Sequence, residues 1–343
     1  MSRSEPKNKQ NNNKITIVQV SESEFSVQGH GVHTAFVETV NGLSAAGVTV
    51  LKNKLWVRAD VRHIHTVGPY ALLHLLFGSG KKVISAHVVP ASFVGSLKGA
   101  EKWLGFATSY LRWFYNRASV VIAVSDETKA ELRKIGVRRP IEVVYNMVDT
   151  QRYVYTASER AAARKKFGFG DGDTVVLGNG QVQPRKRVDT FIRLAHQLPT
   201  IQFVWVGGMP FGKAAANASE METLMHAAPK NVQFTGVVSL AQVREYFIAG
   251  DIFVMSSDQE TFGLAIVEAA ASGMPVVLRD IHDYDNTFRP DAVMCGEDEF
   301  LPALKKLTTD ATYYRTMQKK ALTLARRYDS RVAVAKLLDV YAK

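Results

Sequence analysis

Two glutamates frame an apolar segment, and their spacing could place a carboxylate on each side of a bound ligand. Glu260 and Glu268 stand eight positions apart in QETFGLAIVEAAASGMP, residues 259–275. Gly263 marks the expected start of a helix there, and Gly273 with the proline two positions on ends that helix. Glu260 therefore lies in the loop before the helix, and Glu268 lies in its second turn.

The start of this helix, near Leu264, could bind phosphate oxygens, because the first backbone N–H groups of a helix have no partner within it. A diphosphate bound there would leave one carboxylate at each end to accept hydrogen bonds from hydroxyl groups. Nucleotide sugars have this layout, with a ribose on one side of the diphosphate and a hexose on the other. The plainer interpretation is that Glu260 favours the helix dipole and Glu268 faces solvent. Two glutamates alone favour the plainer interpretation.

Two cations follow a turn in the second half of the chain. Arg185 and Lys186 come directly after GNGQVQP, where they could stabilise the charge that grows on a departing nucleoside diphosphate. The alternative is a solvated basic loop, because Arg187 extends the run. From the residues alone the two interpretations are even.

Two weaker signals come from the first half of the chain. Gly29, Gly31 and Thr34 form a G-x-G-x-x-T pattern between an expected strand and helix. The third glycine of a dinucleotide loop is missing and no acidic residue stands at the ribose position, so the pattern alone favours a plain turn. His87 ends the apolar strand VISAH, at an edge that would face a cleft, although a single histidine there is more often structural.

Metal binding is not expected. His63 and His65 alternate on one strand, but they lack a third ligand. Asp171 and Asp173 form a D-G-D sequence, which has the D-x-D spacing of a known metal-binding motif. Their position in a turn between two domains favours a turn role. We therefore predict no metal and no cofactor.

The elements that must position these residues alternate between β-rich and amphipathic helical runs, which predicts βαβ units and parallel sheets. The expected strands are 15–20, 62–67, 82–88, 119–125 and 141–146, then 174–180, 202–208, 232–238, 252–257 and 275–280. Residues 149–173 are charged and end in a turn-like FGFGDGD, as expected of a linker. We predict a disordered tail at 1–13 and two domains at 14–150 and 151–325, with ligands bound at the carboxyl ends of the strands.

Composition restricts the choice of partner and compartment. The chain has 343 residues, is 46% hydrophobic and carries a net charge of +11, and residues 1–150 contain 19 basic against 11 acidic side chains. This excess favours nucleic acid, an anionic membrane surface or a phosphorylated ligand, but no nucleic-acid-binding motif is present. One cysteine, Cys295, fits a reducing compartment. No apolar run approaches the roughly 20 residues that cross a bilayer, so we expect a cytoplasmic protein.

Residues 98–117 predict a helix with an aromatic stripe on one face and basic residues beside it. The residues expected to bind a membrane are Lys98, Lys102, Trp103, Phe106, Tyr110, Arg112, Trp113, Phe114 and Arg117. Tryptophan, tyrosine and basic residues around an apolar stripe are typical of a helix that lies in a lipid interface. The alternative is a core helix whose long side chains reach solvent at its ends.

Together these motifs resemble those of a known family. ETFGLAIVE followed by SGMPVV resembles the E-x7-E signature of retaining GT-B glycosyltransferases of the family-4 type, and VSDETKAEL (124–132), YNMVDTQRY (145–153) and GQVQPRKRVDTFI (180–192) resemble its other segments. A narrower resemblance, in VQGHGVHTAF (27–36), IHTVGP (64–69) and FVWVGGMPFGK (203–213), is to Gram-positive glycolipid synthases. Those enzymes add a hexose to diacylglycerol or monoglucosyl-diacylglycerol.

The resemblance implies an α/β fold of the GT-B kind, with two facing Rossmann-like domains and a terminal helix, 326–343, that crosses back to the first. It implies that His87, Glu260, Lys186 and Arg185 are catalytic and that a UDP-hexose is the donor. The implied donor-binding residues are Gly29, Gly31, Lys186, Arg185, Glu260, Gly263, Leu264 and Glu268. The family usually has arginine at Gln181 and glycine at Arg187, so only Lys186, and more weakly Arg185, carry over from that loop.

The first hypothesis is a retaining transferase that moves glucose or galactose from a UDP-sugar to a glycerolipid. It would work peripherally on the inner face of the cell membrane and make a glycolipid such as a lipoteichoic acid anchor. The second keeps the fold with a soluble or cell-wall saccharide acceptor. A nucleic-acid binder and a nicotinamide oxidoreductase are weaker alternatives, opposed by the missing motifs and the incomplete glycine-rich loop.

Overall fold

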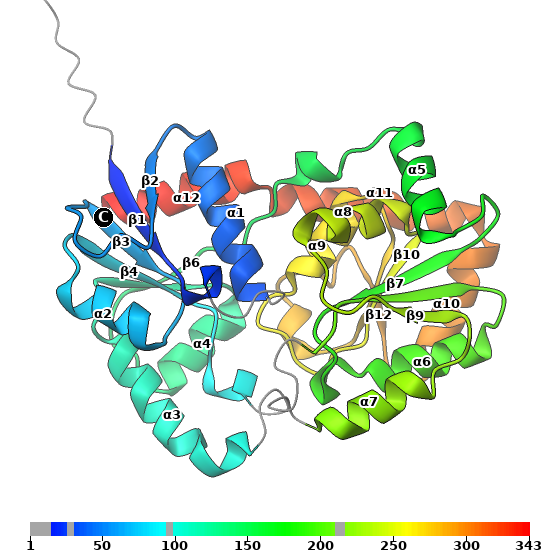
Figure 1. Ribbon diagram of the computed structural model, residues 1–343, viewed down its shortest axis with the longest axis horizontal. Helices are drawn as coiled ribbons and strands as arrows, with labels where there is room; N and C mark the ends of the chain where they lie inside the picture. The colour runs from blue at the N-terminus through cyan, green and yellow to red at the C-terminus, as the bar shows by residue number, and fades with distance from the viewer. Residues whose placement is uncertain (1–14, 26–30, 94–98, 210–216) are drawn as a thin grey trace, which may run out of the picture.

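Two parallel six-stranded sheets form the centres of two domains that lie side by side (Figure 1). The computed structural model describes residues 15–25, 31–93, 99–209 and 217–343, so Gly29 and Lys98 of the predicted sites lie outside the described residues. The first sheet has the order β2-β1-β3-β4-β5-β6, and the second has the order β12-β11-β10-β7-β8-β9.

The strands contain mostly buried aliphatic residues, as expected for sheets covered on both faces. Those of the first sheet are β1 (Thr16–Val20), β2 (Thr49–Lys52), β3 (Val61–Ile64), β4 (Lys81–Ala86), β5 (Val120–Ala123) and β6 (Ile141–Val143). Those of the second are β7 (Val175–Asn179), β8 (Gln202–Val206), β9 (Val232–Phe234), β10 (Ile252–Met255), β11 (Val276–Arg279) and β12 (Val293–Cys295). The ten expected strands are present, and the edge strands β2 and β12 were not expected.

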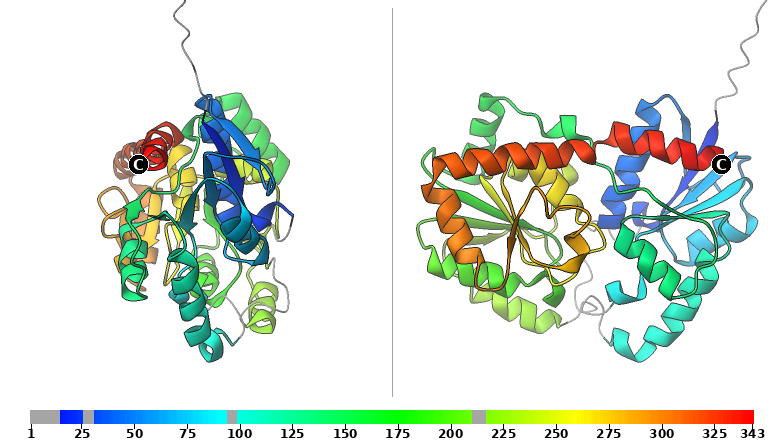
Figure 2. Two further views of the ribbon diagram at one scale, coloured as in Figure 1. Left: turned by 90° about the vertical axis from the view of Figure 1, so that its left-hand side faces the viewer. Right: turned by 180° about the vertical axis from the view of Figure 1, so that it is seen from behind.

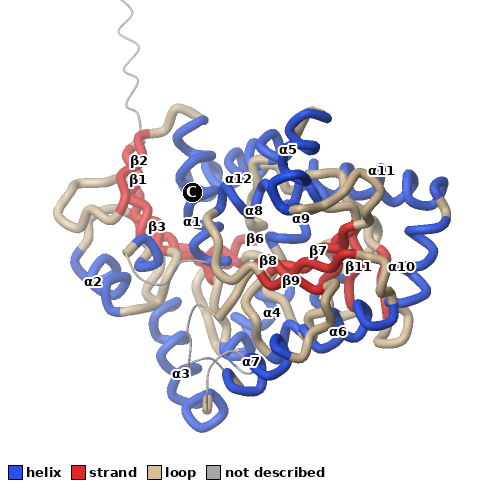
Figure 3. The backbone as a smooth tube through the Cα atoms, turned by 45° about the vertical axis from the view of Figure 1, so that its right-hand side comes forward, coloured by secondary structure: helices blue, strands red, loops and turns tan. Residues whose placement is uncertain are grey.

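Helices cover the sheets from outside, and the strands run through the middle of the molecule (Figure 3). In the first domain they are α1 (Gly31–Ala45), α2 (Pro69–Phe77), α3 (Ala100–Tyr115) and α4 (Asp126–Lys134). In the second they are α5 (Ala157–Phe167), α6 (Val188–Gln197), α7 (Ala218–His226), α8 (Leu240–Ala249), α9 (Leu264–Ala271), α10 (Phe300–Thr309) and α11 (Ala311–Arg327). α12 (Ser330–Ala342) closes the chain.

The C-terminal segment returns to the first domain (Figure 2, right). α11 packs against α9 of the second domain, whereas α12 packs against α1 of the first. The two helices are separated at Asp329, whose side chain caps α12 by accepting from the N–H of Arg331. The returning segment joins the outgoing one there, because Ser330 donates to the carbonyl of Val148 and Val148 donates to that of Tyr328.

Candidate active site

A cavity of about 330 Å³ lies between the two domains and is lined by both. This volume is in the range of small-molecule sites. Of the residues predicted from sequence, the lining includes Gly31, His87, Arg185, Lys186, Glu260, Gly263, Leu264 and Glu268. The structure therefore brings together every described member of the predicted donor site.

The start of α9 has the geometry that the sequence predicts. Gly263 precedes the helix with φ 93°, a left-handed conformation that favours glycine. A Cβ at this position would lie 2.8 Å from Cδ1 of Ile266, so a side chain would also clash there. Every residue from Leu264 to Ala271 is buried, and Gly263, Leu264 and Ala265 at the start of the helix line the cavity.

Glu260 forms ion pairs with both cations that the sequence predicts in the site, Arg185 and Lys186. Its carboxylate contacts the Lys186 ammonium directly, and Nη1 of Arg185 lies 3.9 Å from its other oxygen. Burial alone would raise the pKa of Glu260, but the two positive charges outweigh burial and hold this pKa below its ordinary value. Burial lowers the pKa of Lys186, and Glu260 partly opposes that change.

Glu268 also lines the cavity, in a less polar setting than Glu260. It is buried, and its Oε1 accepts a hydrogen bond of 2.9 Å from the hydroxyl of Tyr153. Burial raises the pKa of Glu268 to about 7, although Tyr153 and the charge of Arg152 lower it. The plainer interpretation of Glu268 as a solvent-facing residue is therefore wrong.

Tyr153 is a site residue that the sequence analysis did not identify. It lies in a short 3-10 turn, Thr150–Tyr153, in the segment that joins the domains. The neighbouring Arg152 forms an ion pair with Glu38 of α1. The segment YNMVDTQRY was noted only as a family resemblance, because no local pattern shows that residue 153 contacts a carboxylate 115 positions later.

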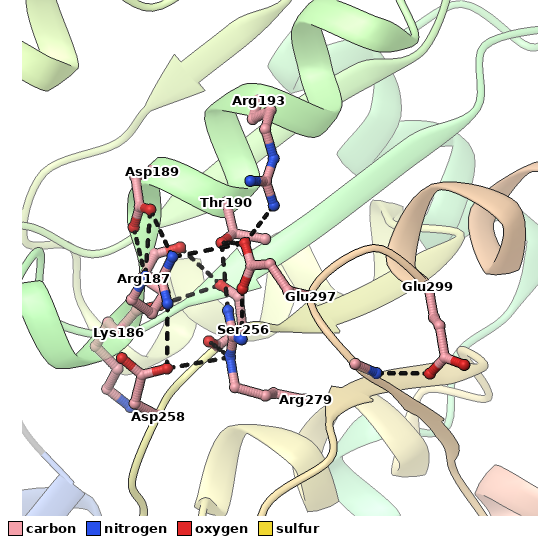
Figure 4. Close-up of polar contacts among 11 residues, drawn as sticks. Lys186, Arg187, Asp189, Thr190, Arg193, Ser256, Asp258, Arg279, Glu297 and Glu299 are labelled. Carbon is pink, nitrogen blue, oxygen red and sulfur yellow. Dashed lines mark hydrogen bonds and ion pairs between the residues drawn. The ribbon is translucent and has the colours of Figure 1, made fainter.

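A network of hydrogen bonds and ion pairs stabilises the backbone of the loop that contains Lys186 and Arg187 (Figure 4). Ser256, directly after β10, donates to the carbonyls of Lys186 and Arg187 over 3.1 and 2.9 Å. The buried Arg279 at the end of β11 donates in turn to the carbonyl of Ser256 over 2.6 Å. The network fixes the backbone of the loop so that the side chains of Arg185 and Lys186 line the cavity.

Arg187 stands where the family usually has glycine, and its contacts show how an arginine is tolerated there. Its backbone has φ 49°, which a non-glycine residue adopts only at a cost of about 1–2 kcal/mol. Its guanidinium forms ion pairs with Asp189, Asp258 and Glu297, as Figure 4 shows. These contacts offset the backbone cost, because each exposed pair contributes up to about 1 kcal/mol.

We expect Arg187→Ala to be less stable than Arg187→Gly by about 1 kcal/mol. Both variants lose the ion pairs, but only the alanine variant keeps the left-handed strain. Urea denaturation of the two variants and the parent measures the difference. Equal stability of the alanine and glycine variants would contradict a strained backbone at residue 187.

His87, directly after β4, lines the cavity from the first domain. Its Nε2 lies 3.1 Å from Nδ1 of His65. Both ring nitrogens of His63 and of His65 are engaged by neighbouring side chains. Asp173 likewise accepts from the N–H of Gly170 over 2.7 Å and closes its own turn. In the described ranges no three histidine, cysteine or acidic residues are grouped to hold a metal ion.

The predicted membrane helix is exposed along only part of its aromatic stripe. Phe106 is 77% and Trp113 is 39% exposed. Tyr110 is half-buried and donates to the carbonyl of Val67 over 2.6 Å, and Trp103 stacks at an angle on Phe93. Phe114 is instead buried in the core of the first domain. Its assignment to the membrane-binding residues is therefore wrong.

The exposed apolar surface extends beyond α3 onto α2, which the sequence analysis did not anticipate. Leu73, Leu76 and Phe77 are 42%, 45% and 62% exposed. An open groove between the two helices is lined by Leu76, Trp113, Arg117 and Arg139, among others. None of the helices in the described ranges has the length and apolarity to cross a membrane.

Two facing parallel α/β domains, with a charged cavity between them and a terminal helix that crosses back, define the GT-B class of transferases. Residues 20–152 match the family model Glycosyltransferase Family 4, and residues 159–321 match the model Glycosyl transferases group 1. The fold of Anabaena HepE in complex with UDP-glucose superposes with a TM-score of 0.75 at 17% identity, over 96% of this chain and 99% of that one.

Curated relatives narrow the class. The alpha-galactosylglucosyldiacylglycerol synthase of Streptococcus pneumoniae is 33% identical over 340 residues, which cover 96% of this chain and 90% of that protein. The processive diacylglycerol alpha-glucosyltransferase of Acholeplasma laidlawii is 25% identical over 83% of this chain and 85% of its own length. The chain belongs to this family of glycosyltransferases and is an enzyme.

Proposed function

We propose that the enzyme transfers glucose or galactose, with retention, from a UDP-sugar to diacylglycerol or monoglucosyl-diacylglycerol at an anionic membrane surface. The main support for this proposal is the cavity, which is lined by the cations Arg185 and Lys186, the start of α9 and the buried carboxylate of Glu268. The 33% sequence identity to the alpha-galactosylglucosyldiacylglycerol synthase of Streptococcus pneumoniae supports a glycerolipid acceptor.

The charge and position of each cavity residue indicate its role in the reaction. The diphosphate lies at the start of α9, where Lys186 and Arg185 stabilise the charge that develops as UDP leaves. Glu268 accepts hydrogen bonds from ribose hydroxyls, and Glu260 and His87 contact the hexose. The acceptor hydroxyl attacks from the face that the UDP leaves, and the donor phosphate helps to remove its proton.

The membrane contact is a docking face, which we define as the exposed apolar residues of α2 and α3 with the cations beside them. Its members are Leu73, Leu76, Phe77, Lys102, Phe106, Arg112, Trp113, Arg117 and Arg139. The guanidinium of Arg117 lies 4.3 Å from the centre of the Trp113 ring. Exposed aromatic and aliphatic groups insert between lipid headgroups, while each cation near an anionic leaflet contributes about 1 kcal/mol.

The proposal is tested by transfer of labelled hexose from UDP-glucose and, separately, UDP-galactose to either glycerolipid in vesicles with and without anionic lipid. A lipid-extractable product that depends on anionic vesicles supports the proposal and identifies donor and acceptor together. Hydrolysis of a donor without any lipid product would instead favour a soluble or cell-wall saccharide acceptor.

We expect Trp113→Glu to weaken binding to anionic vesicles by at least about tenfold, because it replaces an inserted indole by a carboxylate at an anionic surface. Its UDP affinity should not change, since Trp113 is not in the cavity lining. Val332→Glu is the matched control, because Val332 is 58% exposed on α12, away from the docking face. Vesicle sedimentation with equal binding of the two variants would contradict the docking face.

A further inference from the structure

A series of buried polar side chains lies directly behind His87, on one face of the first sheet. The strands begin on this face with apolar residues, among them Ile17 and Val61, which pack with residues of α12. Two residues further along each strand the same face carries Gln19 and His63, because side chains alternate along a strand. His65 continues the series toward the cavity.

The series forms a continuous hydrogen-bonded path from the cavity to the C-terminal helix. Nε2 of His87 lies 3.1 Å from Nδ1 of His65, and Nε2 of His65 lies 2.7 Å from Oε1 of Gln19. The amide nitrogen of Gln19 donates to the hydroxyl of Tyr341 on α12 over 3.2 Å. That hydroxyl lies 2.7 Å from Nδ1 of His63. All five side chains are at most 8% exposed.

Each hydrogen bond in this path needs one donor and one acceptor, so the protons can be assigned in order. Because the Gln19 amide nitrogen faces Tyr341, its carbonyl oxygen faces His65 and can only accept. Nε2 of His65 must therefore carry a proton. Burial lowers the pKa of His65 well below its ordinary value, so the ring is neutral and its Nδ1 has a lone pair. That lone pair requires a proton on Nε2 of His87.

We infer that Gln19 and His65 are positioning residues, which keep a proton on Nε2 of His87 and thereby leave Nδ1 as the unprotonated nitrogen when the ring is neutral. In this form Nδ1 accepts a hydrogen bond, as from a sugar hydroxyl, and does not donate one. The functional part of the inference rests on the proposed contact between His87 and the donor hexose. The protonation state itself does not depend on that proposal.

The protonation state is measured by NMR of the full chain with ¹⁵N-labelled histidine at pH 8 without substrate. Long-range correlations between ring protons and nitrogens distinguish the two neutral forms. Of the nine histidines, His87 is the one whose signals disappear in His87→Asn. We expect the Nε2-protonated form in the parent. A proton on Nδ1 of His87 would overturn the inference.

Gln19→Glu tests the order of donors and acceptors along the hydrogen-bonded path. A carboxylate beside Nε2 of His65 favours the imidazolium form, whose Nδ1–H then donates to Nε2 of His87. We therefore expect the variant to move the His87 proton from Nε2 to Nδ1, opposite to the parent. A correctly folded variant with the parent's His87 signals would show that the path does not control the ring, and would overturn the inference.

A double-mutant cycle separates positioning from a general structural effect. We expect His65→Leu to lower kcat for hexose transfer about tenfold in the parent and to have no further effect in His87→Ala. His65→Asn keeps an acceptor near the position of Nδ1 and should retain most activity. Equal losses from His65→Leu in both backgrounds would overturn the positioning role. Absence of hexose transfer by the parent would defeat the proposed function, and the NMR result would still decide the protonation state.

Discussion

Glu268→Gln is expected to weaken UDP binding by about ten- to a hundredfold and, at pH 8, to make the protein more stable. The two effects have one cause, the buried carboxylate. A hydrogen bond to a charged group contributes about 1.5–3 kcal/mol, and the variant loses the charged acceptor for the ribose hydroxyls. The amide oxygen can still accept from Tyr153, so the hydroxyl that donates to Oε1 of Glu268 keeps a partner.

The stability effect follows from proton linkage. The pKa of Glu268 is raised from 4.5 to about 7, mainly by burial. The folded protein thus holds this proton over a pH range in which the unfolded chain has lost it. The resulting stability is fully present below pH 4.5, decreases through the range up to 7 and is absent above it. Glutamine carries no charge, so its advantage should be a few kcal/mol at pH 8 and should become small near pH 5.

Isothermal titration with UDP and thermal melts at pH 5 and 8 measure both effects. In the parent, UDP affinity should rise as pH increases through about 7, and this dependence should be lost in the glutamine variant. The control is Glu142→Gln, which changes a half-buried surface carboxylate on β6. Unchanged UDP affinity would remove Glu268 from the site, and a lower melting temperature at pH 8 would contradict the cost of its burial.

The residues that sequence identified are those whose signal is local. Glu260, Gly263 and Glu268 lie within nine positions, and one helix start sets their relation. The ten predicted strands are aliphatic runs between turns, and their presence is confirmed. The missed strands β2 and β12 are edge strands of four and three residues with few buried positions, so their apolar runs, Val-Leu and Val-Met-Cys, are too short to distinguish them from loops.

Contacts between distant segments could not be predicted in the same way. Lys186 meets Glu260 across 74 positions and Tyr153 meets Glu268 across 115, and only the folded sheet brings them together. The sequence predicts the cations and the glutamates as separate groups around a diphosphate. In the structure Lys186 and Glu260 already form an ion pair in the lining of the cavity.

The error at Phe114 has a geometric cause. With about 100° per residue, the aromatic stripe of α3 is roughly 100° wide. Its edge at Phe106 and Trp113 faces outward, while the edge at Phe114 borders the buried Leu111. A periodic pattern gives the width of a stripe but not the direction of the core, so the stripe could not be divided before the sheet was known.

The second large effect is expected from Lys186→Met, which should lower kcat about a thousandfold, the range for removal of one preorganised charge from a transition state. The variant should also lose about 3–5 kcal/mol of stability, because it leaves the buried Glu260 without its closest partner. Methionine lacks the ammonium but has a similar length, so the packing of the stem is kept. Steady-state transfer rates and urea denaturation measure the two losses.

Lys186→Met combined with Glu260→Gln separates catalysis from stability. Replacing both members of a buried ion pair is often close to neutral for stability, and Arg185 at 3.9 Å loses only a distant partner. We expect the double variant to recover most of the parent's stability and none of its activity, because the charge that opposes the departing diphosphate is still missing. Recovery of activity together with stability would show that Lys186 acts by holding the fold, and the leaving-group role would then fall to Arg185 and the start of α9.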